Sequence, residues 1–146
     1  MTRAYIVSAC RSPVAPRGGA LAHLSLPDLA APVLIAALTR AGLAPGQVEE
    51  VICSTALGPG GNPARSIALA AGLPEHVAGL SIDRQCAGGL DALALARQMI
   101  LSGTAEVVVA GGVEAVIAAH SSLSCAVLPR DDALRGQRLV ALLNTA

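Results

Sequence analysis

The sequence predicts an α/β fold built on a mixed, mostly parallel sheet. Short apolar runs rich in strand-forming residues alternate with longer helical segments. This alternation is typical of sheets whose strands are joined by crossover helices. Apolar residues make up 53% of the chain and charged residues 14%, so few elements have enough polar residues for a solvated face. We therefore expect both faces of the sheet to be covered.

The expected element order is β-α-β-α-β-α-β. Strands are expected near residues 4–9, 49–55, 77–82 and 106–110. Helices are expected over residues 25–41, 62–72 and 88–102. The connections between them are rich in glycine and proline, which favour turns.

Local signals mark the ends of these helices. Ser25 is followed by Pro27 and Asp28, the pattern of a capping box with proline in the first turn. Gly42 stands where that helix should end in a left-handed residue. Asn62 precedes a proline and predicts the N-cap of the second helix.

Composition excludes several classes of protein. The ten basic residues are all arginine and balance ten acidic residues, so no nucleic acid or anionic membrane is expected as a partner. No uninterrupted apolar stretch reaches the roughly 18 residues of a membrane span, and the start lacks the pattern of a signal peptide. The four cysteines lie far apart, without zinc-ligand spacing. We expect no metal, reduced thiols and a cytoplasmic protein.

Cys86 is the candidate nucleophile. It lies in the segment 81–90 (SIDRQCAGGL), where a strand-like stretch gives way to a long helix. A thiol in the first turn of a helix faces unpaired N–H groups and the positive end of the helix dipole, and both favour the nucleophilic thiolate. The alternative is that Cys86 is a small buried hydrophobic residue, as free cysteines often are.

The helix expected over 88–102 is apolar around most of its circumference. Such a helix is buried on most sides. We therefore expect protein on both of its sides, with a hydrophobic surface helix as the alternative. Cys10 and Cys53, at strand ends, are expected in the core. Arg65 is expected to be a structural or interface residue rather than a catalytic one.

Five segments, in this order, resemble the N-terminal part of the thiolase family from residue 4 to about 115. They are 6–13 (IVSACRSP), 40–43 (RAGL), 62–65 (NPAR), 83–92 (DRQCAGGLDA) and 107–114 (VVVAGGVE). The resemblance implies one half of a five-layer αβαβα fold, in which the helix after Cys86 is buried between two sheets. It also implies that Cys86 accepts an acyl group from acyl-CoA, in 3-ketoacyl-CoA formation or in thiolysis, with its own backbone N–H stabilising the oxyanion. CoA and acyl-CoA are then substrates, and no tightly bound cofactor is expected.

The sequence departs from the family pattern in two respects. Gly88 stands two residues after the nucleophile, where thiolases usually have serine. The second half of a thiolase supplies a histidine base and a second cysteine, but the chain has no Gly-His-Pro run and no second Cys-x-Gly motif. His23, His76 and His120 are expected on the surface. We therefore expect weak or absent activity from this chain alone.

These patterns divide the chain into two segments and suggest which partners it has. Residues 1–118 are expected to form the thiolase N-terminal half-domain, and residues 119–146 an unmatched tail, a remnant of a loop domain or an aberrant terminus. Partners are expected to be a second copy in a homo-oligomer or a complementary thiolase half. Two alternatives remain: a fragment of an initiating-type ketoacyl synthase, and a non-catalytic half-domain that pairs with another chain.

Overall fold

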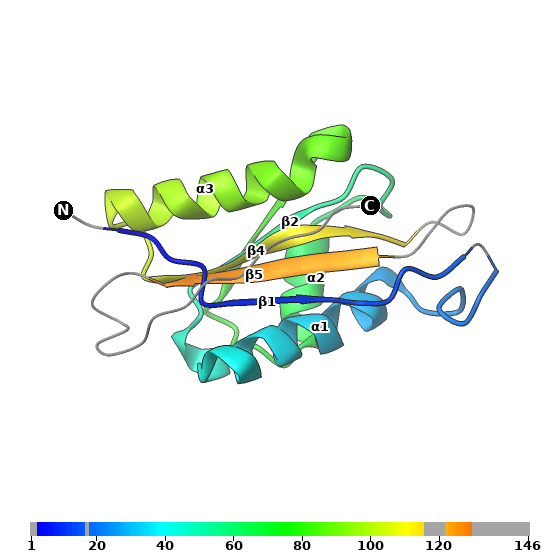
Figure 1. Ribbon diagram of the computed structural model, residues 1–146, viewed down its shortest axis with the longest axis horizontal. Coiled ribbons are helices and arrows are strands. Elements are labelled where there is room, and N and C mark those ends of the chain that lie inside the picture. The colour runs from blue at the N-terminus through cyan, green and yellow to red at the C-terminus, as the bar shows by residue number, and fades with distance from the viewer. Residues whose placement is uncertain (1–2, 17, 116–121, 130–146) are drawn as a thin grey trace.

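One sheet with helices on both faces makes up the fold. The structure, a computed structural model, describes residues 3–16, 18–115 and 122–129. Its strands are β1 (Ser8–Arg11), β2 (Glu50–Ser54), β3 (Ala78–Ile82), β4 (Val107–Glu114) and β5 (Ser122–Pro129). Its α-helices are α1 (Leu26–Ala41), α2 (Pro63–Ala70) and α3 (Gly88–Ser102). Figure 1 shows α3 on one face of the sheet and α1 and α2 on the other.

The sheet is mixed, as predicted, and four of its five strands point in the same direction. Its strand order is β1-β5-β4-β2-β3. Strand β2 pairs in parallel with both β3 and β4, whereas β5 runs antiparallel to both β4 and β1. Strands β1 and β3 therefore form the two edges, with β3 followed along the chain by Cys86.

Strand β5 is the main addition to the predicted order. It lies between β1 and β4, in the segment from which no strand was expected. Its pairing explains two shifted boundaries. Strand β1 is Ser8–Arg11 rather than 4–9, because these are the residues that pair with β5. Strand β4 continues through Gly111 and Gly112, which pair with both β2 and β5, and its pairing with β5 extends to Glu114.

The two central parallel strands have apolar side chains on both faces. Val51 and Cys53 of β2 belong to the core under α1 and α2, whereas Ile52 between them packs in the core under α3. In β4, Val109 and Val108 divide between the two cores in the same way. Because side chains alternate along a strand, a continuous apolar run serves two cores at once.

The predicted ends of α1 are confirmed. Ser25 is the N-cap, and its Oγ accepts a hydrogen bond from the backbone N–H of Asp28 at 3.3 Å. Gly42 ends the helix with φ of 68°, and its N–H binds carbonyls of the last turn. These local contacts satisfy backbone groups that a helix end leaves unpaired.

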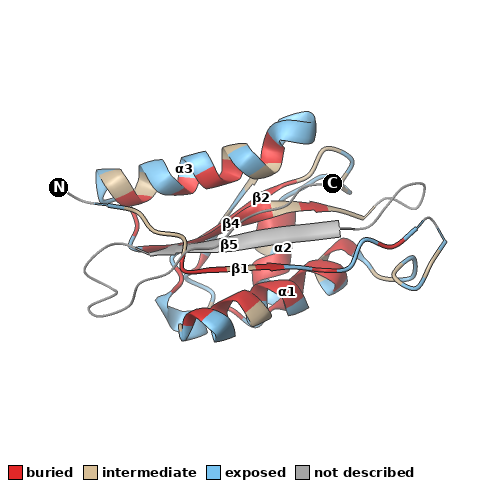
Figure 2. Ribbon diagram, in the orientation of Figure 1, coloured by how far each residue is buried: buried red, intermediate tan, exposed pale blue. Residues whose placement is uncertain are grey.

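Helix α3 is covered on one side in this chain, which differs from the expectation of cover on both. Ala92, Ala96 and Ile100 are fully buried against the sheet. Leu90 and Leu95, by contrast, are 69% and 40% exposed. Figure 2 shows this division, with the buried positions of α3 facing the sheet and the exposed positions facing outward. The described residues contribute one sheet, so the outer face of α3 has no second layer from them.

Asn62 ties α2 to the edge strand β3. Its Oδ1 accepts hydrogen bonds from the backbone N–H of Arg65 at 3.1 Å and from Ser81 Oγ at 2.7 Å. Its Nδ2 donates to the Gly79 carbonyl at 2.7 Å. The predicted N-cap therefore also fixes the position of the strand that leads to Cys86.

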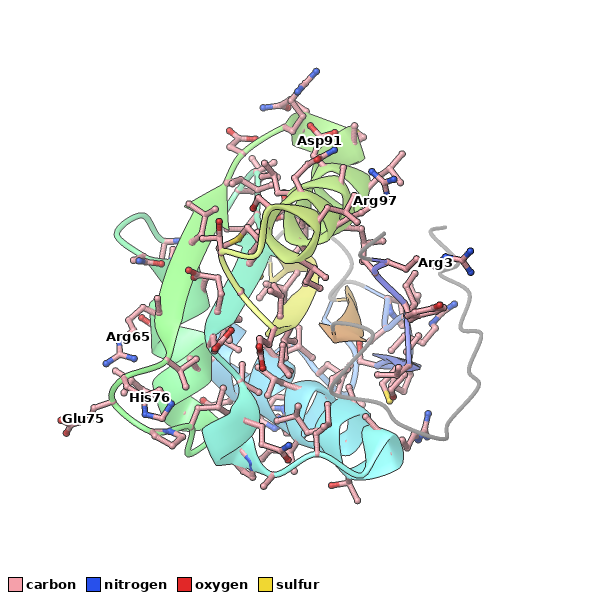
Figure 3. The ribbon with its side chains drawn as sticks, turned by 90° about the vertical axis from the view of Figure 1, so that its left-hand side faces the viewer. Arg3, Arg65, Glu75, His76, Asp91 and Arg97 are labelled. Atoms are coloured by element: carbon pink, nitrogen blue, oxygen red, sulfur yellow. The ribbon has the colours of Figure 1, made fainter. Side chains whose placement is uncertain are left out.

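Arg65 completes this attachment and is structural, as predicted. Its guanidinium donates to the carbonyl of Val77 and, at 3.0 Å, to that of Glu75. Both acceptors lie in the connection that enters β3. Figure 3 shows Arg65, Glu75 and His76 together on this side of the molecule. None of the helices in the described part of the chain has the length and hydropathy that a bilayer span requires.

Replacing Asn62 with alanine should destabilise the protein by about 2 kcal/mol, because it removes a helix cap and two further hydrogen bonds. Urea unfolding followed by circular dichroism measures the change. The matched control is Gln98→Ala, at an exposed position of α3, which should change the free energy of unfolding by less than about 0.5 kcal/mol. Equal effects from the two variants would contradict the role given to Asn62.

Cys53 should make the protein less stable at alkaline pH. Burial raises the pKa of its thiol from 9.0 to about 12, and the nearby Glu114 carboxylate adds to the shift. Between these values the unfolded chain loses a proton that the folded chain keeps, so stability falls as pH rises. The slope approaches about 1.4 kcal/mol per pH unit.

Urea unfolding between pH 8.5 and 11.5 measures this slope. The chain has no lysine, so the side chain that most often titrates in that window in other proteins adds nothing to the slope. Cys53→Ala should be less stable at pH 8.5 and should show a shallower decline. An unchanged slope in that variant would rule out Cys53 as the source.

Candidate functional site

Cys86 lies beyond the carboxyl ends of the parallel strands. Strands β2, β3 and β4 run in the same direction, so their carboxyl ends meet there. Cys86 follows the end of β3 by four residues and precedes α3 by two. In open α/β sheets, ligands bind outside the carboxyl ends of the strands.

A tight turn presents Cys86 to solvent. It lies in a 3₁₀ turn, Gln85–Ala87, and is exposed. The backbone N–H of Ala87 donates to the carbonyl of Arg84 at 3.2 Å. The N–H of Gly88 donates in the same way to the carbonyl of Gln85. These hydrogen bonds join residues three apart in the chain, as in a 3₁₀ helix. Cys86 therefore precedes α3 rather than lying in its first α-helical turn.

The residue before Cys86 has a strained backbone. Gln85 has φ of +49°, in the left-handed region that side chains other than glycine rarely adopt. Its N–H donates to Asp83 Oδ1 at 2.9 Å, which holds the turn in place. Strained residues cluster where the surrounding structure fixes a functional group, so Gln85 marks this turn as a candidate site.

Below the turn, α3 approaches the sheet closely because side chains are missing on both sides. A Cβ on Gly112 of β4 would be 3.4 Å from the Cα of Gly89 and 3.4 Å from the carbonyl oxygen of Ser54. A Cβ on Gly89 would be 3.9 Å from the backbone nitrogen of Gly112. The start of α3 therefore rests on the backbone of β4, next to its neighbouring strand β2.

Glu114 fastens the loop that follows β2. Its carboxylate accepts hydrogen bonds from the backbone N–H groups of Ala56 and Leu57, the latter at 3.3 Å. Thr55 Oγ1 donates to the same carboxylate at 3.4 Å. Glu114 ends β4, so this network joins the carboxyl ends of two neighbouring strands beside the Cys86 turn.

The described histidines lie away from Cys86. His76 precedes β3, whereas Cys86 follows it, and a five-residue strand is about 17 Å long. His23 lies in the connection after β1, at the opposite edge of the sheet, and four strand spacings amount to about 19 Å. Both side chains are exposed. His120 lies outside the described residues.

The remaining candidates have structural surroundings. Cys10 and Cys53 are buried, as expected. Arg84 and Asp91 form an exposed ion pair of 2.8 Å across the start of α3, and Figure 3 shows Asp91 on that helix. Among the described residues, no cluster of histidine, cysteine and carboxylate side chains could hold a metal ion.

Sequence reasoning missed two features of the site. The left-handed φ of Gln85 has a partial signal, since an aspartate two residues earlier favours a turn. The contact of Ser54 with the start of α3 has none, because the two segments are more than thirty residues apart and meet through the sheet.

Comparison with known proteins identifies the family. The family profile described as Thiolase, N-terminal domain, matches residues 4–139. The match extends past residue 115, where the motif resemblance ends. An acetyl-CoA acetyltransferase of Cupriavidus necator is 50% identical over 121 residues, which cover 82% of this chain and 31% of that protein. A steroid 3-ketoacyl-CoA thiolase of Mycobacterium tuberculosis is 46% identical over 117 residues, covering 78% of this chain and 29% of that protein.

The fold agrees with that assignment. The crystal structure of the Bacillus anthracis acetyl-CoA acetyltransferase matches with a TM-score of 0.78 at 44% identity, over 82% of this chain and 31% of that one. The chain thus spans less than a third of the length of these relatives. It belongs to the thiolase family, and its structure corresponds to the N-terminal region of a thiolase.

Proposed function

We propose that this chain carries the acyl-accepting nucleophile of a thiolase, and that Cys86 is that nucleophile. The exposed position of Cys86, on a strained turn between a strand and a helix, carries the proposal. A sharp strand-to-helix turn is a common way to expose a nucleophile at the carboxyl edge of a sheet. The substrate is an acyl-CoA, in agreement with the relatives' names, acetyl-CoA acetyltransferase and steroid 3-ketoacyl-CoA thiolase.

The reaction is an acyl transfer between two thiols. Cys86 Sγ, as a thiolate, attacks the carbonyl carbon of the acyl-CoA thioester. The new bond joins Sγ to that carbon, and the bond between the carbon and the CoA sulfur breaks. The leaving CoA sulfur takes up a proton to become the free thiol. A backbone N–H directed at the oxyanion would stabilise the intermediate, and one such donor contributes about 3 kcal/mol in other enzymes.

The described part of the chain does not supply the general base for this step. A base must lie within hydrogen-bond reach of the nucleophile, and His23 and His76 lie at distant positions. We propose that the base and the residues for the second half of the reaction come from a complementary thiolase half. The exposed leucines on the outer face of α3 support such a partner, because apolar surface of this kind favours association.

The further features of this proposal follow the same reasoning. The active species is an assembly, either a homo-oligomer or a complex with a complementary half, and CoA acts as substrate rather than as a bound cofactor. Its expected location is the cytoplasm, where thiols remain reduced. Non-catalytic pairing of the half-domain is the competing proposal, and it too is supported by the outer face of α3.

Cys86 should react with iodoacetamide faster than Cys10 and Cys53 in the folded protein. Cys10 and Cys53 are buried, so their alkylation requires local opening and should be at least about tenfold slower. Mass spectrometry of peptides after timed alkylation measures each rate. Cys86→Ser should remove the fast reaction, whereas Cys53→Ala should keep it. Faster labelling of Cys10 than of Cys86 would count against the exposed-nucleophile assignment.

Thiolysis of acetoacetyl-CoA should be absent or very slow with the purified chain and should appear on complementation. The complement is the part of the Cupriavidus necator acetyl-CoA acetyltransferase beyond the aligned segment, co-expressed with this chain. CoA-dependent loss of acetoacetyl-CoA absorbance measures turnover, and peptide mass spectrometry detects an acetyl group on Cys86. Cys86→Ser is the control and should abolish both signals.

Two results would contradict the proposal. Robust turnover by the isolated chain would show that it supplies its own base. A stable complex that never acetylates Cys86 would favour the non-catalytic pairing module instead.

A further inference from the structure

Gly88 lacks a side chain for reasons of space rather than of backbone conformation. Its φ of −59° and ψ of −38° are ordinary helical values that any residue adopts. A Cβ built on Gly88 would lie 1.7 Å from Ser54 Oγ and 2.7 Å from Ser54 Cβ. Real Cβ atoms do not approach other atoms so closely, so Ser54 occupies the volume that a side chain at residue 88 would fill.

Ser54 is a buried hydroxyl at the carboxyl end of β2. It is 4% exposed, one of the few polar residues in the interior. Its backbone carbonyl lies under the same helix start, close to Gly112. The residue therefore contacts the start of α3 two positions after Cys86. Burying a hydroxyl there costs free energy that an apolar side chain would not.

We propose that Ser54 is a positioning residue for Cys86. We also propose that residues 54 and 88 share one seat, by which we mean a volume between β2 and α3 that holds a single hydroxyl-bearing side chain. Thiolases usually carry serine at the position of Gly88, and here the hydroxyl comes from β2 instead. The proposal deepens the function proposed above and rests on it for the role of Cys86. The pairing of the two residues, however, stands on the geometry alone.

The shared seat makes a specific prediction about two reciprocal changes. Gly88→Ser alone places two side chains in one volume and should lower the melting temperature by roughly 5–10 °C. Ser54→Gly together with Gly88→Ser returns a single hydroxyl to the seat and should recover most of that loss. Ala94→Ser, at an exposed position of the same helix, is the control and should leave the melting temperature within about 2 °C of the parent.

The positioning role needs a readout that packing alone would not move. Ser54→Ala keeps the volume free of a clash but removes the hydroxyl. The pH profile of Cys86 alkylation by iodoacetamide should shift in Ser54→Ala and return in the reciprocal double variant. Ser54→Thr keeps a hydroxyl and should retain the parent profile.

Each outcome decides the proposal. A double variant no more stable than Gly88→Ser would overturn the shared seat, as would a Gly88→Ser variant as stable as the parent. A Ser54→Ala variant with the parent's pH profile would overturn the positioning role. These measurements use the full chain without acyl-CoA. Failure of Cys86 to become acylated on complementation would therefore count against the proposed function alone.

Discussion

The close approach of α3 to the carboxyl ends of β2 and β4 is the constraint on which the site depends. Gly89 and Gly112 leave backbone facing backbone at the point of contact, and Gly88 leaves room for Ser54. The helix start is therefore set by atoms of the sheet rather than by flexible side chains. The turn that carries Cys86 is held from the other side by Asp83. The exposed thiol thus lies in a well-supported 3₁₀ turn, although it belongs to no α-helix or strand.

Much of the fold could be predicted because its signals are local. Ser25 and Gly42 define the ends of α1 through contacts within a few residues, and Gly88–Ser102 was expected as a helix over that same range. The rest depends on contacts between distant segments. The extents of β1 and β4 follow from pairing with β5, and β5 carries no strand signal that sequence reasoning used. The candidate nucleophile was found from its position before a helix. The reason for Gly88, by contrast, lies in a serine on another strand.

The candidate site contains some of the features that the proposed acyl transfer requires. Cys86 is exposed at the carboxyl edge of the sheet, and Glu114 joins the neighbouring strand ends beside it. His76 lies before β3, at the opposite end of that strand from Cys86, and His23 lies after β1, at the opposite edge of the sheet. The two faces of α3 show the same asymmetry, since one is fully buried and the other presents leucine to solvent. The described histidines lie away from Cys86, and α3 is covered on one side. Both observations are consistent with the proposed larger assembly.

Alanine is the commonest buried apolar residue in the described part of the chain. The alanines there that are fully buried are Ala30, Ala37, Ala64, Ala68, Ala92, Ala96 and Ala110. At such positions an alanine scan has nothing to delete, so the helix–sheet contacts would go unnoticed in a survey by truncation. Enlargement is the informative perturbation, because every added methylene must displace a helix from the sheet. Mapping the tolerance of this core therefore calls for substitutions that add volume, such as valine or leucine in place of alanine.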